Sequence, residues 1–120
     1  MDKVNTKAYM ADRRSNGCMI WVERSDAGGA GYWLPKHDPA NHSPDGFEWG
    51  YGGSGPAALA SSILYDATGC KCCYQEFKSQ VVQGFPHDAW RIRQEEVKAF
   101  IEIIRKRRGH GQDCELLRQE

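Results

Sequence analysis

A glycine-rich turn at residues 46–56 holds the densest set of residue types that could do chemistry in this chain. Glycines stand at positions 46, 50, 52, 53 and 55. Glycine is favoured where the backbone takes a positive φ or where another group must approach closely. Because a helical pattern begins at Pro56, the free N–H groups and positive dipole end of that helix would face the turn. The turn therefore predicts a site for a small anionic ligand.

Side chains in and beside the turn supply further contacts for such a ligand. The rings of Trp49 and Tyr51 could stack on a base or another planar ring, and the Glu48 carboxylate could accept hydrogen bonds from its edge. Ser54 could offer its hydroxyl to the helix as a cap or to the ligand. The predicted ligand-binding residues are His42, Ser43, Phe47, Glu48, Trp49, Tyr51, Gly52, Gly53, Ser54 and Gly55.

A purely structural role for the turn stays open beside this one. The glycines would then only form a tight strand-to-helix turn, with Phe47 and Trp49 buried and Glu48 paired with a nearby cation. The turn matches neither the G-x-x-x-x-G-K-[ST] nor the G-x-G-x-x-G phosphate motif. Residues 52–56 also fail the nucleophile-elbow pattern G-x-S-x-G at its last position.

Catalytic and metal-binding chemistry has weaker support in the sequence. His42, Glu48 and Ser54 could act in a small enzyme on a phosphate-bearing substrate, but no cofactor fingerprint or metal cluster accompanies them. The cysteines at positions 70, 72 and 73 lack the second ligand pair that a structural zinc site normally uses. We expect reduced thiols at a helix start, with no metal, no cofactor and no catalytic residue.

One basic cluster ends the last predicted helix. Such a cluster can grip phosphates, yet cations also favour the negative C-terminal end of any helix. Sixteen basic and sixteen acidic residues leave zero formal net charge, so no overall field attracts nucleic acid or an anionic membrane. We expect the helix-stabilising role, with nucleic-acid binding as the less favoured alternative. The cluster consists of Arg105, Lys106, Arg107 and Arg108.

The strands that would position the turn lie near the N-terminus. Residues 7–13 and 18–23 are rich in β-favouring side chains and flank Asn16 and Gly17, a pair typical of a two-residue hairpin turn. Residues 32–34 form a short run closed by a proline, as in an edge strand. These runs predict a small N-terminal antiparallel sheet.

The remainder of the chain is mostly helical in pattern. The predicted helices extend from Pro56 to the glycine at position 69, from 73 to 83, and from 94 to 108. Trp90 and Ile92 would form a further short strand or a contact onto the core. The predicted fold is therefore α+β, an antiparallel hairpin and edge strand packed with about three helices.

Length and composition indicate one domain. The chain has 120 residues, of which 40% are hydrophobic and 27% charged, and residues 1–109 would form the domain with a frayed tail at 110–120. Without a long apolar run or an apolar leader, we expect a cytoplasmic location and no membrane partner. An exposed Trp21 or Trp33 on the hairpin could line the interface of a homo-oligomer.

Residues 41–57 also resemble a known signature, roughly N-H-S-P-x-G-F-E-W-G-Y-G-G-S-G-P-A. It is similar to that of a family of small uncharacterised bacterial and phage proteins, and the likeness extends over about residues 30–100. One departure is Arg93, where the family tends to have a helix-capping Thr or Ser. The resemblance implies a phage or mobile-element context, in which small domains bind or block a host component.

These observations predict a non-enzymatic binding module that presents residues 46–56, flanked by His42, to a small anionic or nucleotide ligand or to a host protein. In the family context, the module would sequester a nucleotide-type signal or block a host defence protein. The alternatives are the small enzyme described above and a structural or accessory phage protein in which the turn only aids folding.

Overall fold

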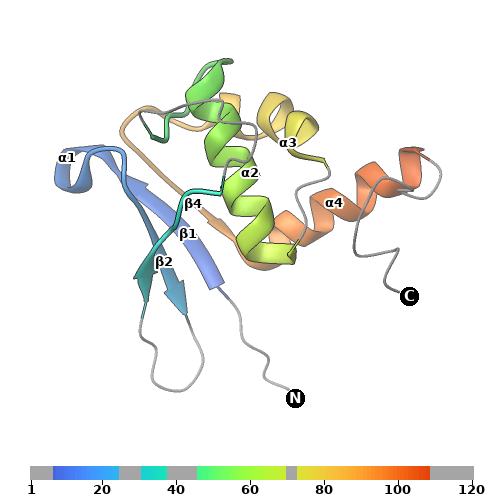
Figure 1. Ribbon diagram of the computed structural model, residues 1–120, viewed down its shortest axis with the longest axis horizontal. Helices are drawn as coiled ribbons and strands as arrows, with labels where there is room; N and C mark the ends of the chain where they lie inside the picture. The colour runs from blue at the N-terminus through green and yellow to red at the C-terminus, as the bar shows by residue number, and fades with distance from the viewer. Residues whose placement is uncertain (1–6, 25–30, 38–45, 70–72, 109–120) are drawn as a thin grey trace.

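The computed structural model describes residues 7–24, 31–37, 46–69 and 73–108. It confirms the predicted α+β class, with helices packed on an antiparallel sheet (Figure 1). The elements in chain order are β1 (Lys7–Asp12), α1 (Arg13–Asn16), β2 (Ile20–Arg24), β3 (Tyr32–Trp33), α2 (Ser54–Thr68), α3 (Tyr74–Gln80), the 3-10 turn η1 (Val82–Gly84), β4 (Ala89–Arg93) and α4 (Gln94–Arg108).

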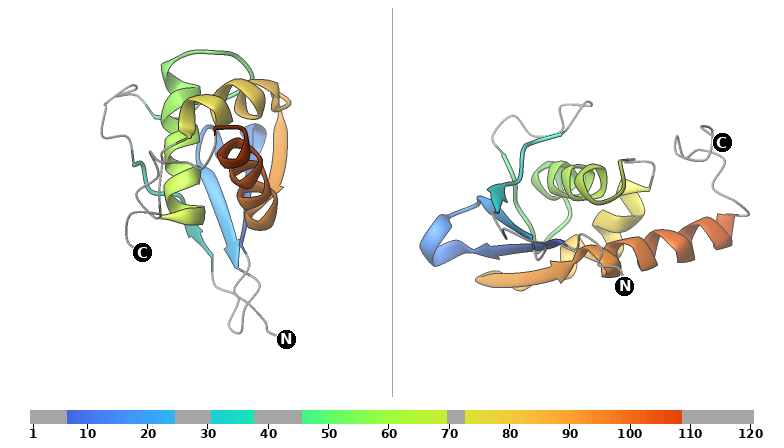
Figure 2. Two further views of the ribbon diagram at one scale, coloured as in Figure 1. Left: turned by 90° about the vertical axis from the view of Figure 1, so that its right-hand side faces the viewer. Right: turned by 90° about the horizontal axis from the view of Figure 1, so that it is seen from below.

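The sheet has the strand order β3-β2-β1-β4, and each neighbouring pair is antiparallel. Tyr9 lies opposite Val22 on one side and Ile92 on the other. Because side chains alternate between the two faces of a strand, these residues share the inner face, while Met10 and Trp21 belong to the outer face. Helix α2 lies along the inner face, and within the described part of the chain no helix lies across the outer one (Figure 2).

The predicted hairpin of β1 and β2 is confirmed, but its connection is not the two-residue turn that Asn16 and Gly17 indicate. Strand β1 ends at Asp12 because the Asp12 carboxylate accepts a hydrogen bond from the Ser15 N–H at 3.3 Å and caps the short helix α1. Gly17, with φ of 61°, then ends α1. The Asn-Gly pair thus closes a helical turn.

The other predicted elements agree with the structure except at their ends. Helix α4 spans the predicted residues, and Gly69 ends α2 in the left-handed conformation with φ of 79°. Of the two alternatives for Trp90 and Ile92, the short strand is the one observed, because both residues lie on β4. The predicted helix over 73–83 is wrong as one unit, because α3 ends at Gln80 and η1 follows. This break points the Val82 carbonyl at the Gly50 N–H, 3.1 Å away.

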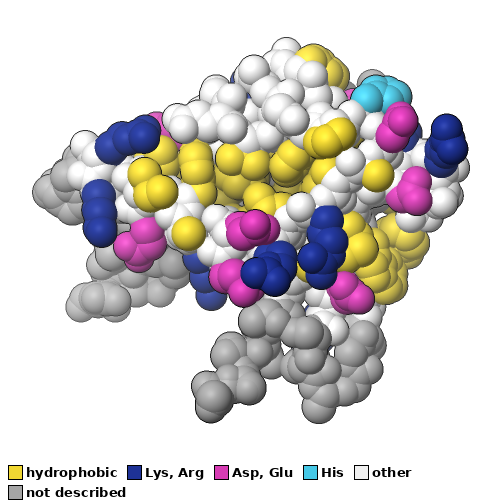
Figure 3. Space-filling view, turned by 180° about the vertical axis from the view of Figure 1, so that it is seen from behind, with side chains coloured by type: hydrophobic (Ala, Val, Ile, Leu, Met, Phe, Trp, Pro, Cys, Tyr) yellow, Lys and Arg dark blue, Asp and Glu magenta, His cyan; other side chains and the backbone are white. Residues whose placement is uncertain are grey.

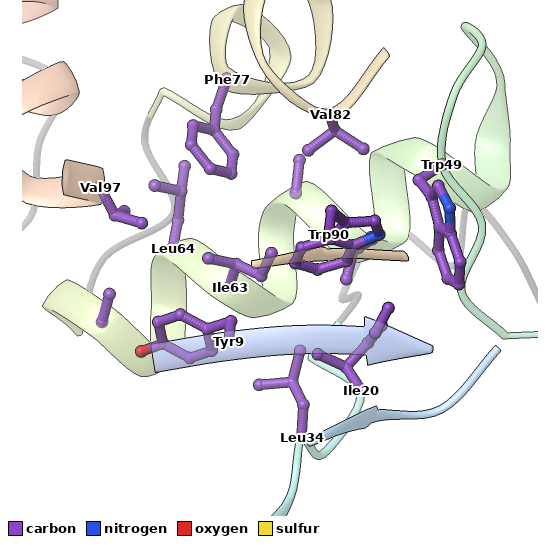
Figure 4. Packing of buried hydrophobic residues seen from close by; sticks show 14 of the residues in the cluster. Tyr9, Ile20, Leu34, Trp49, Ile63, Leu64, Phe77, Val82, Trp90 and Val97 are labelled. Atoms are coloured by element: carbon purple, nitrogen blue, oxygen red, sulfur yellow. The ribbon is translucent and has the colours of Figure 1, made fainter. Parts of the chain in front are cut away.

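Helix α2 forms the centre of the hydrophobic core. Residues 55–64 are buried without interruption, because α3 and α4 pack against the helix and the inner face of the sheet shares its core cluster. Ile63 and Leu64 point toward the side chains that the strands, α3 and α4 contribute (Figure 4). The helix therefore fixes where the turn at its N-terminus lies relative to the sheet.

A polar network joins the far end of α2 to the sheet. The Asp66 carboxylate accepts hydrogen bonds from the Tyr9 hydroxyl at 2.6 Å and the Tyr32 hydroxyl at 2.7 Å. It also pairs with the Lys7 ammonium at 3.1 Å. Burial and the hydrogen bond to Asp66 raise the pKa of the Tyr9 phenol above its ordinary value. The network holds β1 and β3 in place against the helix.

Replacing Asp66 should therefore destabilise the fold. We expect Asp66→Ala to lower the free energy of unfolding by about 1.5–3 kcal/mol, because buried hydroxyls lose a charged acceptor. Urea denaturation at neutral pH measures the difference. Asp88→Ala is the matched control, since the Asp88 side chain is 76% exposed and its removal should change little. Equal losses in both variants would contradict a structural role for the network.

Candidate functional site

The glycine-rich turn packs closely against the segment that leads to β4. Gly50 takes φ of 88°, a conformation that favours glycine. A Cβ at Gly55 would lie only 2.7 Å from Cβ of Glu48, so a larger residue would force the first turn of α2 away. The turn is therefore a tight joint between α2 and the chain around Val82 and Phe85.

Trp49 is a core residue, which the structural alternative anticipated. Its side chain is 1% exposed, and its indole N–H donates to the His87 carbonyl at 3.0 Å. The ring meets Trp90 edge to face with centroids 5.7 Å apart, and the Arg13 guanidinium lies 4.2 Å from its centroid. Figure 4 shows the ring pointing into the cluster. Trp49 thus offers no open ring face on which a ligand could stack.

Glu48 is held by side chains from the β1–β2 connection. Arg13 forms a two-pronged pair with its carboxylate, from Nη2 to Oε1 at 3.0 Å and from Nη1 to Oε2 at 3.3 Å. The Cys18 thiol also donates to Oε2 at 3.0 Å. The hydrogen bond from Arg13 lowers the pKa of Glu48, whereas burial and the neighbouring Glu48 raise the pKa of the Cys18 thiol. A charged carboxylate beside a protonated thiol is a stable structural pair, not a poised nucleophile.

The rest of the predicted binding set is dispersed. Tyr51 is 51% exposed and Ser54 is exposed, but Ser54 is the first residue of α2 and the residue before it, Gly53, provides no side-chain cap. Phe47 is half-buried and lines a small hollow of 220 Å³ together with Cys18 and Trp33. His42 and Ser43 lie outside the described residues. The turn thus keeps some exposed groups, although its aromatic and acidic centre is closed.

Sequence reasoning missed the two partners of Glu48. Arg13 and Cys18 precede it by 35 and 30 positions, and no spacing rule connects them. The only signal was the general expectation that an isolated carboxylate pairs with a cation. The antiparallel pairing of β1 and β2 brings the ends of these strands to the turn, so the contact follows from topology.

The outer face of the sheet presents a more open arrangement. Cross-strand pairing aligns Trp33 with Trp21, Trp21 with Met10, and Met10 with Arg91, which we call the outer row. The two indoles meet edge to face at 4.9 Å, and Trp33 is 43% exposed. Figure 3 shows hydrophobic side chains in a band across the back of the molecule, with charged side chains along its border.

A hollow of 530 Å³ lies beside the outer row, a volume within the usual range of ligand sites. Met10 and Trp21 give it apolar walls, while Asp12, Asn16 and Arg91 supply charged and hydrogen-bonding groups. This combination of apolar walls and a few polar groups is typical of small-molecule sites. The sequence signalled only that Trp21 or Trp33 would be exposed, because the row depends on the strand register.

The structure adds no further support for the predicted nucleic-acid contact at the basic cluster or for a metal site at the cysteines. Lys106 and Arg107 are exposed on the projecting end of α4, whereas the side chains of Arg105 and Arg108 are not described. Within the described ranges, no three His, Cys, Asp or Glu side chains gather as metal ligands would, and Cys70 and Cys72 lie outside them. None of the described helices combines the length and apolar character needed to cross a membrane.

Comparison with known families identifies the chain. Residues 9–103, more than half of its length, match the model of a family of unknown function, DUF6166. The chain belongs to this family. The DUF6166 match begins within β1 and ends within α4, so it covers both the glycine-rich turn and the outer row. No curated protein and no solved structure matches the chain. The bacterial or phage origin that the resemblance implies stays a prediction.

The tight packing of the turn can be tested by two glycine substitutions. We expect Gly55→Ala to lower the free energy of unfolding by about 1–3 kcal/mol, because its Cβ would overlap Glu48. Gly84→Ala is the matched control, since nothing lies within 4 Å of a Cβ there and the loss of chain entropy on folding decreases. Thermal unfolding followed by circular dichroism compares the two. A fully stable Gly55→Ala variant would disprove the close approach.

The Arg13–Glu48 pair should make stability depend on pH. Since the folded pKa of Glu48 lies below its ordinary 4.5, the unfolded chain binds more protons near that pH. The contribution of the pair to the free energy of unfolding is present above about pH 4.5 and is lost as pH falls through the folded pKa of Glu48. The free energy of unfolding, measured with urea across acidic pH, should therefore change less steeply with pH in Glu48→Gln and in Arg13→Gln than in the wild type. If both variants lost the same amount of stability at every pH, the pair would not be the source of the pH dependence.

Proposed function

We propose that this DUF6166 protein is a non-enzymatic binding module whose contact surface is the outer face of its sheet. The observation that carries the proposal is the outer row, in which Trp33, Trp21 and Met10 align beside the cation Arg91. Trp33 is 43% exposed, and Trp21 and Met10 beside it are half-buried. Apolar surface bordered by charge is a feature of binding surfaces on small domains. The hollow beside the row adds a concave element to this surface.

The glycine-rich turn has a lesser part in this proposal than the sequence alone suggests. Its carboxylate is held by Arg13 and its tryptophan is buried, which leaves Tyr51 and Ser54 as exposed groups. The same internal pairing of Glu48 weakens the case for an enzyme built on that carboxylate, since a general base needs to reach its substrate. Binding without turnover is the function that these contacts support best.

The biological setting of the proposal rests on the sequence resemblance alone. In a phage or mobile element, such a module would sequester a nucleotide-type signal or block a host defence protein. The signature at residues 41–57 motivates this setting, and the outer row supplies a surface that either target could contact.

Affinity capture with matched surface variants tests the proposed function. Wild-type protein, Trp33→Ser and Ile103→Ser would each be incubated with host lysate, and mass spectrometry would identify retained proteins and small molecules. Both replaced side chains are exposed, Trp33 at 43% and Ile103 at 51%, but Ile103 lies on α4 and is not part of the outer row.

We expect at least one retained component to be lost in Trp33→Ser and kept in Ile103→Ser. Removal of an aromatic anchor from a binding surface typically costs about 2 kcal/mol or more, roughly a thirtyfold loss of affinity. An identical set of retained components in all three samples would refute binding through the outer face.

A further inference from the structure

We propose that the hollow beside the outer row binds a free mononucleotide, with its base against Trp21 and Met10 and its phosphate at Arg91. This inference rests on the proposed function and names the ligand class of the same surface. No feature of the glycine-rich turn enters it, because Arg13 and the His87 carbonyl already engage Glu48 and Trp49.

The apolar wall of the hollow suits a planar ring. Trp21 provides an aromatic side chain and Met10 a polarizable thioether, directly opposite each other on β2 and β1. Gly31 helps to position the indole, since a Cβ there would lie 2.5 Å from Trp21 Cζ2. The absence of a side chain at this position lets the indole lie over the β3 edge of the sheet. Every nucleobase has a flat π face that can stack on an aromatic ring such as that of Trp21.

The cation at the end of the row suits a phosphate. Arg91 lies opposite Met10 and is 55% exposed, and its nearest ion-pair contact is a 3.6 Å approach of Nη2 to Oε1 of Glu23. That separation is too long for a good hydrogen bond, so the guanidinium can turn toward a ligand. Arginine binds phosphate through paired, charge-assisted hydrogen bonds.

Two polar side chains beyond Met10 set the direction of the ligand in the hollow. Asp12 lies two residues beyond Met10 on β1, and Asn16 follows on α1. The Asp12 carboxylate, which already accepts hydrogen bonds from Ser15, disfavours a phosphate at this end. The Asn16 amide offers both a donor and an acceptor, the pair that recognises the N6/N7 edge of adenine. Charge and hydrogen bonding therefore place the phosphate at Arg91 and favour an adenine base.

A free nucleotide fits this surface better than a nucleic-acid strand does. Polymer binding draws its affinity from many phosphate contacts, and the chain has zero formal net charge. Arg91 is the one cation among the described residues that line the hollow, and the neighbouring Arg93 lies 3.8 Å from a carboxylate oxygen of Glu95. One phosphate site beside one hollow matches a single nucleotide.

Isothermal titration calorimetry with adenosine 5′-monophosphate, adenosine and inorganic phosphate tests the assignment on the full chain. We expect the monophosphate to bind at least about tenfold more tightly than adenosine, because only it reaches Arg91 with a charged group. Arg91→Gln should reduce its affinity to that of adenosine. Glu23→Gln should increase it, since the competing carboxylate is removed. Lys106→Gln, an exposed cation on α4, should leave it unchanged.

Several results would overturn the assignment. These are the absence of monophosphate binding at millimolar concentration, an equal loss in Arg91→Gln and Lys106→Gln, or tighter, salt-dependent binding of an adenine trinucleotide. Circular dichroism checks that each variant is folded. Because the Arg91 and Glu23 side chains are exposed, their replacement should leave the fold intact. Capture that depends on Trp33 without nucleotide binding would leave the proposed function standing and remove only the ligand assignment.

Discussion

The guanidinium of Arg13 holds together three parts of the chain that sequence separates widely. It pairs with Glu48 in the turn, lies over the Trp49 ring, and donates from Nε to the His87 carbonyl at 3.0 Å. The backbone N–H of the same residue donates to the Asp88 carbonyl at 2.8 Å. Arginine suits this position because its planar, always charged group can pair and stack at once. The turn, the β1–β2 connection and the start of β4 are thereby fixed as one unit.

This junction explains why the two faces of the sheet differ in character. With the turn locked, α2 extends from it along the inner face, where Tyr9 and Val22 are buried and Ile92 is partly buried. The polar groups near the turn bond to one another, and among the described buried side chains the Trp90 indole N–H alone has no hydrogen-bond partner. The outer face carries indole and thioether side chains without a covering helix among the described elements (Figure 3). Exposed apolar surface of this kind is costly in water and is usually explained by binding.

Local patterns predicted the elements better than their ends. The apolar stripe of α4 and the glycine after α2 specify those elements through the immediate chain. The connection at Asn16 and Gly17 was predicted wrongly, because the Asp12 side chain captures a backbone N–H and starts a helical turn instead. Helix α3 ends early because the chain continues as a 3-10 turn, in which the Gly84 N–H donates to the Val81 carbonyl at 3.0 Å. At both places a specific hydrogen bond overrides the average preference of the residues.

The sequence by itself determined the fold class, most of the elements, and a glycine-rich turn that leads into a helix. It also left open whether that turn is a site or a joint, and named burial of Trp49 and pairing of Glu48 as the structural outcome. Only the tertiary structure decided the identity of the partner, Arg13, and the alignment of Trp33, Trp21, Met10 and Arg91. The reason is physical: an amphipathic pattern reflects the environment of each residue along its own element. The register between strands depends on contacts between residues far apart in the chain.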